Sequence, residues 1–133
     1  MNIEAVQLVS LPKIPDDRGN LSFFQNRGHI PFDISRVYWI YDVPGGERRG
    51  GHAYHTLQEF IIALSGSFDV ILHDGRREIK YTLNRSYYGL LIPNRIWRHM
   101  ENFSTNAVAL ITADRPYSEV EYIRNFEQFK ATD

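Results

Sequence analysis

The amino-acid sequence predicts an all-β fold with many antiparallel strands, a sandwich, jelly roll or barrel, and a short C-terminal helix. Apolar residues recur in short blocks rich in Val, Ile, Tyr and Phe, and Gly, Pro, Asn and Asp separate these blocks. Two of the blocks alternate between apolar and polar residues, as a strand with one buried face does. A chain of 133 residues with 43% hydrophobic content is expected to form one domain, residues 1–133.

The expected strands follow one another along the whole chain. Their blocks are residues 5–11, 20–24, 34–43, 59–66, 67–75, 77–84, 87–93 and 107–113. A further strand is expected at His52 and Tyr54. The alternating blocks, 68–72 and 79–83, are joined by the turn sequence "HDGRR", which predicts a β-hairpin.

The segment 118–130, "SEVEYIRNFEQFK", is the one part of the sequence with a helical pattern. Val120, Ile123 and Phe126 would share one helix face, with acidic residues early and a lysine late. We therefore expect a helix there.

Charge and composition exclude several classes of protein. Fifteen Lys and Arg balance sixteen Asp and Glu, a net charge of −1, so no global field would attract nucleic acid or an anionic membrane. The N-terminal residues lack a secretory signal pattern, no apolar run approaches membrane-spanning length, and the chain has no cysteine. We expect a cytoplasmic protein whose partners include neither nucleic acid nor membrane.

The stretch "GGHAYHTLQEFIIALSG" has the spacing of a metal site. His52 and Tyr54 are two residues apart on a strand and so share a face, while His55 points to the other. Glu59 follows five residues after Tyr54, and Gly66 follows seven after Glu59. This pattern resembles the first motif of the cupin superfamily, in which Tyr54 replaces the second histidine.

The stretch "GLLIPNRIWRHMEN" resembles the second cupin motif, with Arg98 where a histidine is expected. The two motifs together imply a cupin-type double-stranded β-helix, a jelly roll. A phenol is a poor metal ligand, and a guanidinium stays positively charged where a cation would sit. Replacement by His55 or by His99, beside Arg98, would require a β-bulge. The sequence therefore predicts a site without a metal or other cofactor.

Four further stretches carry a closer resemblance that spans almost the whole chain. They are "DDRGNLSFF", "ISRVYWIYDVPGGERRGGHAYH", "LIPNRIWRHMENFS" and "YIRNFEQF". They are similar to the WxcM-like nucleotide-sugar 3,4-ketoisomerases. The resemblance implies one cupin domain, a homodimer, and a metal-independent isomerase that moves the carbonyl of a dTDP-4-keto-6-deoxyhexose from C4 to C3.

Two histidines are the proton-transfer residues of that family. Arg49, Gly50, His52 and Ala53 match its motif, while Tyr54 stands at the second histidine and His55 at a lysine. Moving a ketone to the next carbon requires a base with a pKa near neutrality to take the C3 proton, which favours His52. Tyr54 would relay a proton or hold the enediol, and His55 or water is its alternative.

The remaining candidate residues would bind the substrate. Glu59 would orient His52, accept from sugar hydroxyls, or form a buried ion pair with Arg98, and these roles are compatible. Arg18, Arg49 and Arg98 would bind the diphosphate.

Tyr38 and Trp97 offer aromatic faces for thymine, although core or interface packing is the commoner role of such residues. Two other functions remain open: a non-catalytic nucleotide-sugar-binding cupin, and a metal-dependent cupin enzyme.

Overall fold

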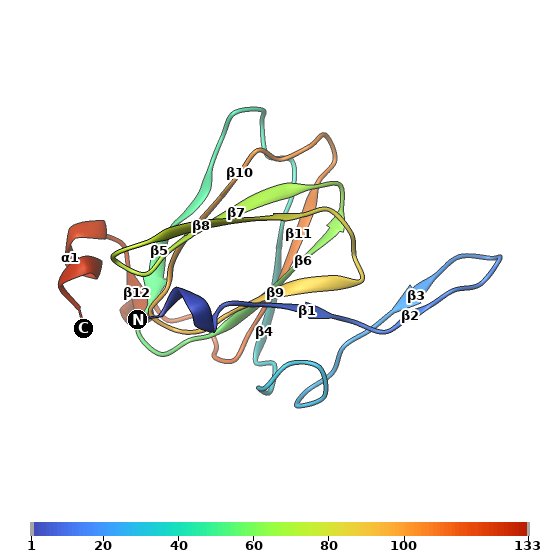
Figure 1. The fold of residues 1–133 in the computed structure, drawn as a ribbon, viewed down its shortest axis with the longest axis horizontal. Helices are drawn as coiled ribbons and strands as arrows, with labels where there is room; N and C mark the ends of the chain where they lie inside the picture. Colours follow the sequence, from blue (N-terminus) through green and yellow to red (C-terminus); the bar gives the residue numbers. More distant parts are fainter. Residues whose placement is uncertain (1, 133) are drawn as a thin grey trace.

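Two five-stranded antiparallel sheets face each other in the computed structural model, which describes residues 2–132 (Figure 1). The first sheet has the order β1 (Gln7–Ser10), β9 (Tyr88–Ile92), β6 (Glu59–Ser65), β11 (Val108–Ala113) and β4 (Arg36–Ile40). The second has the order β12 (Tyr122–Ile123), β5 (Arg49–Tyr54), β10 (Trp97–Glu101), β7 (Phe68–His73) and β8 (Glu78–Leu83). This is the jelly-roll arrangement that the sequence predicts.

The predicted hairpin is confirmed. Strands β7 and β8 pair with Phe68 opposite Leu83 and Val70 opposite Tyr81. Phe68, Val70 and Leu83 are fully buried in the core cluster between the sheets. This register keeps these three side chains inside, because a shift of one residue would turn them to the opposite face of the sheet.

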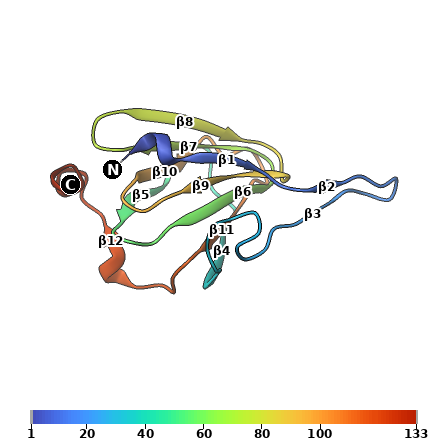
Figure 2. The same ribbon diagram turned by 60° about the horizontal axis from the view of Figure 1, so that its bottom comes forward.

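The block expected as a strand at 20–24 forms something different. Only β3 (Leu21–Ser22) is extended in a ladder, paired with β2 (Lys13–Ile14) in a separate two-stranded sheet. These strands form an arm that projects from the barrel at the end opposite the C-terminal helix, as the turned view in Figure 2 also shows. Ile14, Leu21 and Phe23 on the arm are exposed. Two strands alone bury too little apolar surface to be stable.

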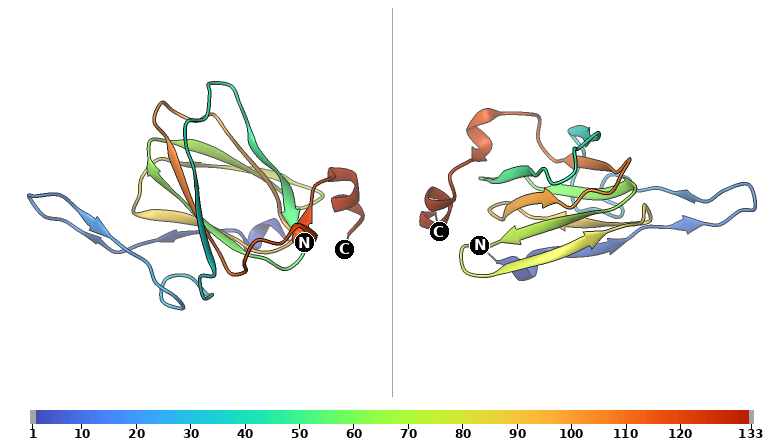
Figure 3. Two further views of the ribbon diagram at one scale, coloured as in Figure 1. Left: turned by 180° about the vertical axis from the view of Figure 1, so that it is seen from behind. Right: turned by 90° about the horizontal axis from the view of Figure 1, so that it is seen from above.

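The expectation of a helix over 118–130 is wrong for its first half. A 3-10 turn, Glu119–Glu121, is followed by β12, in which Tyr122 lies opposite Tyr54 and Ile123 opposite Ala53. The helix α1 (Phe126–Ala131) begins only after Asn125, whose side chain accepts a hydrogen bond from the Gln128 amide at 2.9 Å. Pairing with the edge of β5 overrides the helical pattern. Both ends of the chain lie near this side of the barrel (Figure 3).

Candidate active site

A cavity of about 480 Å³ opens inside the barrel between β4 and β5, strands of opposite sheets. Along β4, residues 36, 38 and 40 are partly buried while residues 37 and 39 are exposed. This alternation turns Arg36 and Tyr38 toward the cavity. From β5 the cavity receives His52 and Tyr54, which share the inner face as the sequence predicts.

A β-bulge in β5 fixes the position of His52. His52 pairs with Arg98 of β10, whereas His99 pairs with Gly50, so Gly51 is the extra residue. Gly50 and Gly51 have φ of 100° and 85°, a region that favours glycine, and a side chain at Gly50 would meet the His99 backbone at 3.0 Å. Gly50 and Gly51 therefore form a bulge within β5.

A chain of hydrogen bonds joins the inner residues of the cavity. His52 Nε2 lies 3.1 Å from the Tyr54 hydroxyl, and this hydroxyl donates to Glu59 Oε2 at 3.3 Å. The Tyr38 hydroxyl donates to the same oxygen at 2.5 Å. Arg98 Nη1 donates to Glu59 Oε1 at 2.6 Å, and both side chains of this ion pair are almost fully buried, with 1% and 2% exposed. Imidazole, phenol, carboxylate and guanidinium thus form one connected unit.

The surroundings of these groups set their protonation. Burial, reinforced by the positive charges of Arg98, Arg124 and Arg36, lowers the pKa of His52 from its ordinary value of 6.5 to about 3. Burial and then the charge of Glu59 raise the pKa of the Tyr54 phenol above its ordinary value of 10. At neutral pH, His52 is therefore a neutral imidazole with a free lone pair, and Tyr54 is a neutral phenol.

Arginines occupy both ends of the cavity. Arg36, Arg98 and Arg124 lie near enough to His52 for their charges to act on its pKa. Arg48 and Arg49 line the cavity where β5 begins, beside the loop that connects β4 to β5. With the proton-transfer group at one end, Arg48 and Arg49 at the other end suit a ligand that joins a reacting centre to an anion.

The structure brings together six of the eight residues that the sequence analysis proposed. His52, Tyr54, Glu59, Arg98, Tyr38 and Arg49 all line the cavity. Trp97 lies elsewhere: its ring packs on Phe126 and Phe129 of the C-terminal helix, at centroid distances of 5.2 and 5.7 Å. The expectation that Trp97 is a cavity residue is therefore not met.

Arg18 also lies outside the cavity of its own chain. It sits on the projecting arm with 90% of its side chain exposed, and it pairs with Asp16 at 3.0 Å. The two alternative histidines lie outside as well. His55 is exposed beyond the end of β5, and His99 pairs with Glu101 at 2.7 Å.

The cavity residues that the sequence analysis missed include three arginines and a tyrosine: Arg36, Arg48, Arg124 and Tyr122. The alternation of "RVYWI" places Arg36 on the same face as Tyr38, so this signal was present. Tyr122 and Arg124 were hidden by the helical pattern, which did not indicate that this segment adds a strand beside β5.

Two kinds of feature, a metal-ligand cluster and a membrane-spanning helix, are not found among residues 2–132. In that part of the chain, no group of three or more His, Cys, Asp or Glu side chains is arranged to hold a metal ion. At the histidine position of the second cupin motif stands Arg98, held by Glu59. Within the same residues, no helix is both long and apolar enough to cross a membrane.

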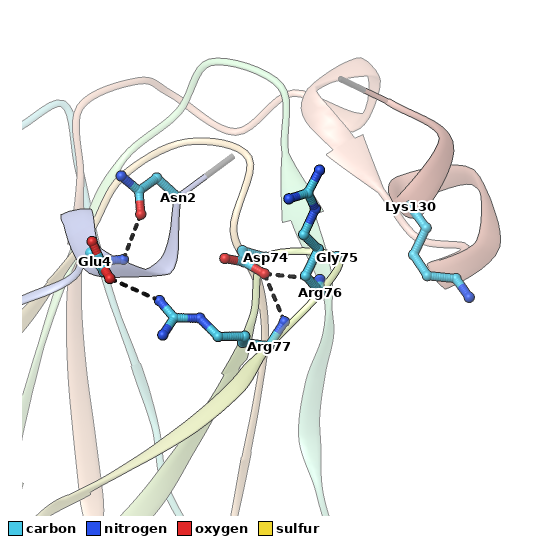
Figure 4. A pocket seen from close by; sticks show the side chains of 7 residues that line it. All are labelled: Asn2, Glu4, Asp74, Gly75, Arg76, Arg77 and Lys130. Atoms are coloured by element: carbon cyan, nitrogen blue, oxygen red, sulfur yellow. Dashed lines mark hydrogen bonds and ion pairs between the residues drawn. The ribbon is translucent and has the colours of Figure 1, made fainter.

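A second cavity, about 590 Å³, lies between the N-terminal turn η1 (Ile3–Ala5) and the β7–β8 turn (Figure 4). The Asp74 carboxylate accepts from the amides of Ile3, Arg76 and Arg77, and Arg77 pairs with Glu4 at 3.1 Å. Burial opposes ionisation of Asp74, but these hydrogen bonds prevail and lower its pKa to about 2. The Asp74 contacts tie the chain terminus to the barrel.

The fold and the first cavity define a class: a cupin-type jelly roll with an acid–base site among arginines. The chain matches the family model FdtA, described as WxcM-like, C-terminal, over residues 4–133. It belongs to this family.

Named relatives agree with this assignment. The chain is 38% identical to the TDP-4-oxo-6-deoxy-alpha-D-glucose-3,4-oxoisomerase of Aneurinibacillus thermoaerophilus, over 93% of this chain and 89% of that protein. The TDP-quinovose 3,4-ketoisomerase WlaRB of Campylobacter jejuni is 40% identical, with a TM-score of 0.93 and coverage of 98% and 100%. A mutant of the 3,4-ketoisomerase QdtA of Thermoanaerobacterium thermosaccharolyticum, solved with TDP-4-keto-6-deoxyglucose, is 33% identical, with a TM-score of 0.95 and coverage of 98% and 94%.

Proposed function

We propose that this protein is a sugar 3,4-ketoisomerase that moves the carbonyl of dTDP-4-keto-6-deoxyglucose from C4 to C3. The observation that carries the proposal is the hydrogen-bonded unit of His52, Tyr54, Glu59 and Arg98 inside an arginine-lined cavity. The relatives named above, whose names specify this reaction or this sugar, support the choice of substrate.

The reaction is a pair of proton transfers. His52, neutral because of its lowered pKa, takes the C3 proton; the C3–H electron pair becomes the C3=C4 double bond, and the carbonyl pair moves to O4. Tyr54 donates a proton to O4 and regains one through its contact with His52. The C3 hydroxyl then gives its proton to the His52–Tyr54 pair, and its O–H electron pair forms the C3 carbonyl. The C3=C4 electron pair forms a new C4–H bond with a proton that the same pair returns. Atoms and electrons balance without an oxidant.

Glu59 and Arg98 keep Tyr54 in place for this step. Glu59 accepts from Tyr54 and Tyr38, and Arg98 balances the charge of the buried carboxylate. Tyr38 is thus assigned to the sugar end of the cavity rather than to thymine. Burial is the largest cause of the lowered pKa of His52, and the charges of Arg98, Arg124 and Arg36 add to it, so negative charge that develops on the sugar during the reaction favours proton uptake by His52.

The diphosphate is assigned to the end of the cavity that holds Arg48 and Arg49. A charge-assisted contact contributes roughly 1.5–3 kcal/mol, so Arg49→Ala should weaken TDP binding about tenfold or more in calorimetry. Unchanged affinity would remove Arg49 from the phosphate site.

The proposed reaction is tested by incubating the purified protein with dTDP-4-keto-6-deoxyglucose and following the carbonyl carbon by NMR. We expect the signal to move from C4 to C3. Binding of TDP without any movement of the carbonyl would contradict isomerase activity and support a non-catalytic nucleotide-sugar-binding cupin.

We further propose that the protein is a homodimer in which the arm of one chain lies against its partner. The exposed apolar side chains of the arm need a surface to cover them, and β4 is an edge strand whose outer face exposes Val37 and Trp39. Arg18 can contribute to phosphate binding only in the partner's cavity, because its arm projects away from its own.

Mixed dimers test this arrangement. Arg18→Ala and His52→Asn should each lower activity when present in both chains. Co-expressing the two variants should restore activity, because the site that keeps His52 would receive Arg18 from the other chain. A mixture no more active than the average of the two variants, or a monomeric mass at micromolar concentration, would contradict the proposal.

A further inference from the structure

Arg36 is a cavity residue for which the mechanism above has no role. It is the first residue of β4 and faces inward with Tyr38. Strand β4 continues through the loop of residues 41–48 into β5, so the start of β4 lies level with the end of β5, where Tyr54 is found. The charge of Arg36 acts on the pKa of His52, which places the guanidinium beside the acid–base unit.

Aromatic rings hold the Arg36 guanidinium in one orientation. Its Cζ atom lies 4.4 Å from the centre of the Tyr38 ring and 5.3 Å from that of Tyr117. It also interacts electrostatically with Tyr122, whose ring centroid lies 5.0 Å from the His52 imidazole. A planar guanidinium held between aromatic rings in this way directs its donors without reorganisation.

Two arginine N–H donors in this cavity have no hydrogen-bond partner in the part of the chain that the structure describes. Arg36 Nη1 and Arg98 Nη2 are buried, and neither has a hydrogen-bond partner among residues 2–132. The other nitrogens of Arg98 are occupied, since Nε donates to the Ile96 carbonyl at 3.1 Å and Nη1 to Glu59 at 2.6 Å. A buried donor without a partner costs folding free energy, and in a ligand cavity the ligand normally satisfies it.

We propose that Arg36 is a catalytic residue of the isomerisation, whose unpaired Nη1 donates to the sugar oxygen that becomes negative as the enediolate forms. The inference rests on the proposed function. When His52 removes the C3 proton, the carbonyl electron pair moves to O4, and a donor fixed in advance stabilises this charge more than it stabilises the neutral ketone. The unpaired Nη2 of Arg98 supplies a second donor from the facing strand.

The alternative role for Arg36 is phosphate binding. The structure instead favours a contact between Arg36 and the sugar. Arg48 and Arg49 lie at the opposite end of the cavity and are exposed, as suits groups that meet a diphosphate at the entrance. Arg36 instead shares its contacts with Tyr38 and Tyr122, the rings that adjoin Glu59 and His52.

The test compares wild type with Arg36→Gln and Arg36→Lys, using TDP as a probe that carries nucleotide and diphosphate but no sugar. Loss of one oxyanion donor is expected to lower kcat about 100- to 1000-fold, with TDP affinity unchanged within about twofold. Exchange of the C3 proton with deuterated water should fall by the same factor, because both processes pass through the enediolate. Arg36→Lys keeps the charge and should retain part of kcat.

The possible failures are distinguishable. If wild type does not isomerise the sugar, the proposed function is wrong. If wild type is active and Arg36→Gln keeps its kcat, or if Arg36→Gln weakens TDP binding about tenfold, Arg36 is not an enediolate donor. Arg85→Gln is the matched control, since Arg85 is an exposed loop arginine outside the cavity. Should Arg36→Gln fail to fold, Arg36→Lys decides the outcome through the same comparison of kcat with TDP affinity.

Discussion

Acid should destabilise the folded protein through His52. The pKa of this imidazole is about 3 in the folded chain, where burial and three guanidiniums oppose its protonation, against an ordinary value of 6.5. Between these values the unfolded chain binds one more proton than the folded chain. Stability is therefore full above about pH 6.5 and is lost as the pH falls toward the folded pKa.

The magnitude follows from the difference in pKa. Each pH unit below the unfolded pKa costs about 1.4 kcal/mol, so lowering the pH from 7 to 4.5 should remove roughly 2.7 kcal/mol through His52 alone. His52→Asn cannot take up this proton. Between pH 7 and 4.5, the free energy of unfolding should therefore fall by roughly 2.7 kcal/mol less in His52→Asn than in wild type. The other titrating groups contribute equally to both proteins.

Urea unfolding curves of wild type and His52→Asn, recorded at a series of pH values from 7 to 4.5, measure this difference. Each curve gives a free energy of unfolding, and the two pH profiles should diverge below about pH 6. Parallel profiles would refute the reasoning, because they would mean that the folded protein accommodates a charged imidazole at this position. A pKa of His52 near 6.5 by NMR would refute it independently.

Three further predictions concern the same unit. Tyr54→Phe should lower turnover about a hundredfold while leaving some C3 exchange, and a fully active variant would show that the phenol only packs. Arg98→Met should lower the free energy of unfolding by about 3–5 kcal/mol in urea, because it leaves the buried Glu59 charge unpaired. The double variant with Arg98→Met and Glu59→Leu should recover most of this loss. Activity should survive EDTA, and elemental analysis should find no stoichiometric transition metal; loss of activity on chelation, restored by one divalent metal, would overturn the site assignment.

The fold was predictable wherever alternation was strict and turn residues were clear. The β7–β8 hairpin is an example, because Phe68, Val70 and Leu83 can be buried in one register only. The tail was not, because the spacing of Val120 and Ile123 fits a helix equally well. Its actual partner is the edge of β5, a contact distant in sequence that a local pattern does not encode.

The inner part of the site was predictable because residues two apart on a strand share a face, which places His52 with Tyr54. The β5 bulge was not, since "GG" before a strand also suits a turn. Arg18 was expected in the cavity because of its place in the stretch "DDRGNLSFF", and Trp97 because of its aromatic ring. Their locations depend on where the arm and helix α1 pack, which no local pattern specifies.

One measurement tests the central claim most directly: exchange of the C3 proton of dTDP-4-keto-6-deoxyglucose with deuterated water, compared between wild type and His52→Asn. Wild type should incorporate deuterium at C3 of the remaining 4-keto sugar, by reversal of the first proton transfer, and at C4 of the 3-keto product. His52→Asn should bind TDP with unchanged affinity and incorporate none above the uncatalysed rate, since no other group in the cavity offers a neutral imidazole. Exchange at the wild-type rate in His52→Asn would contradict the assignment of the base.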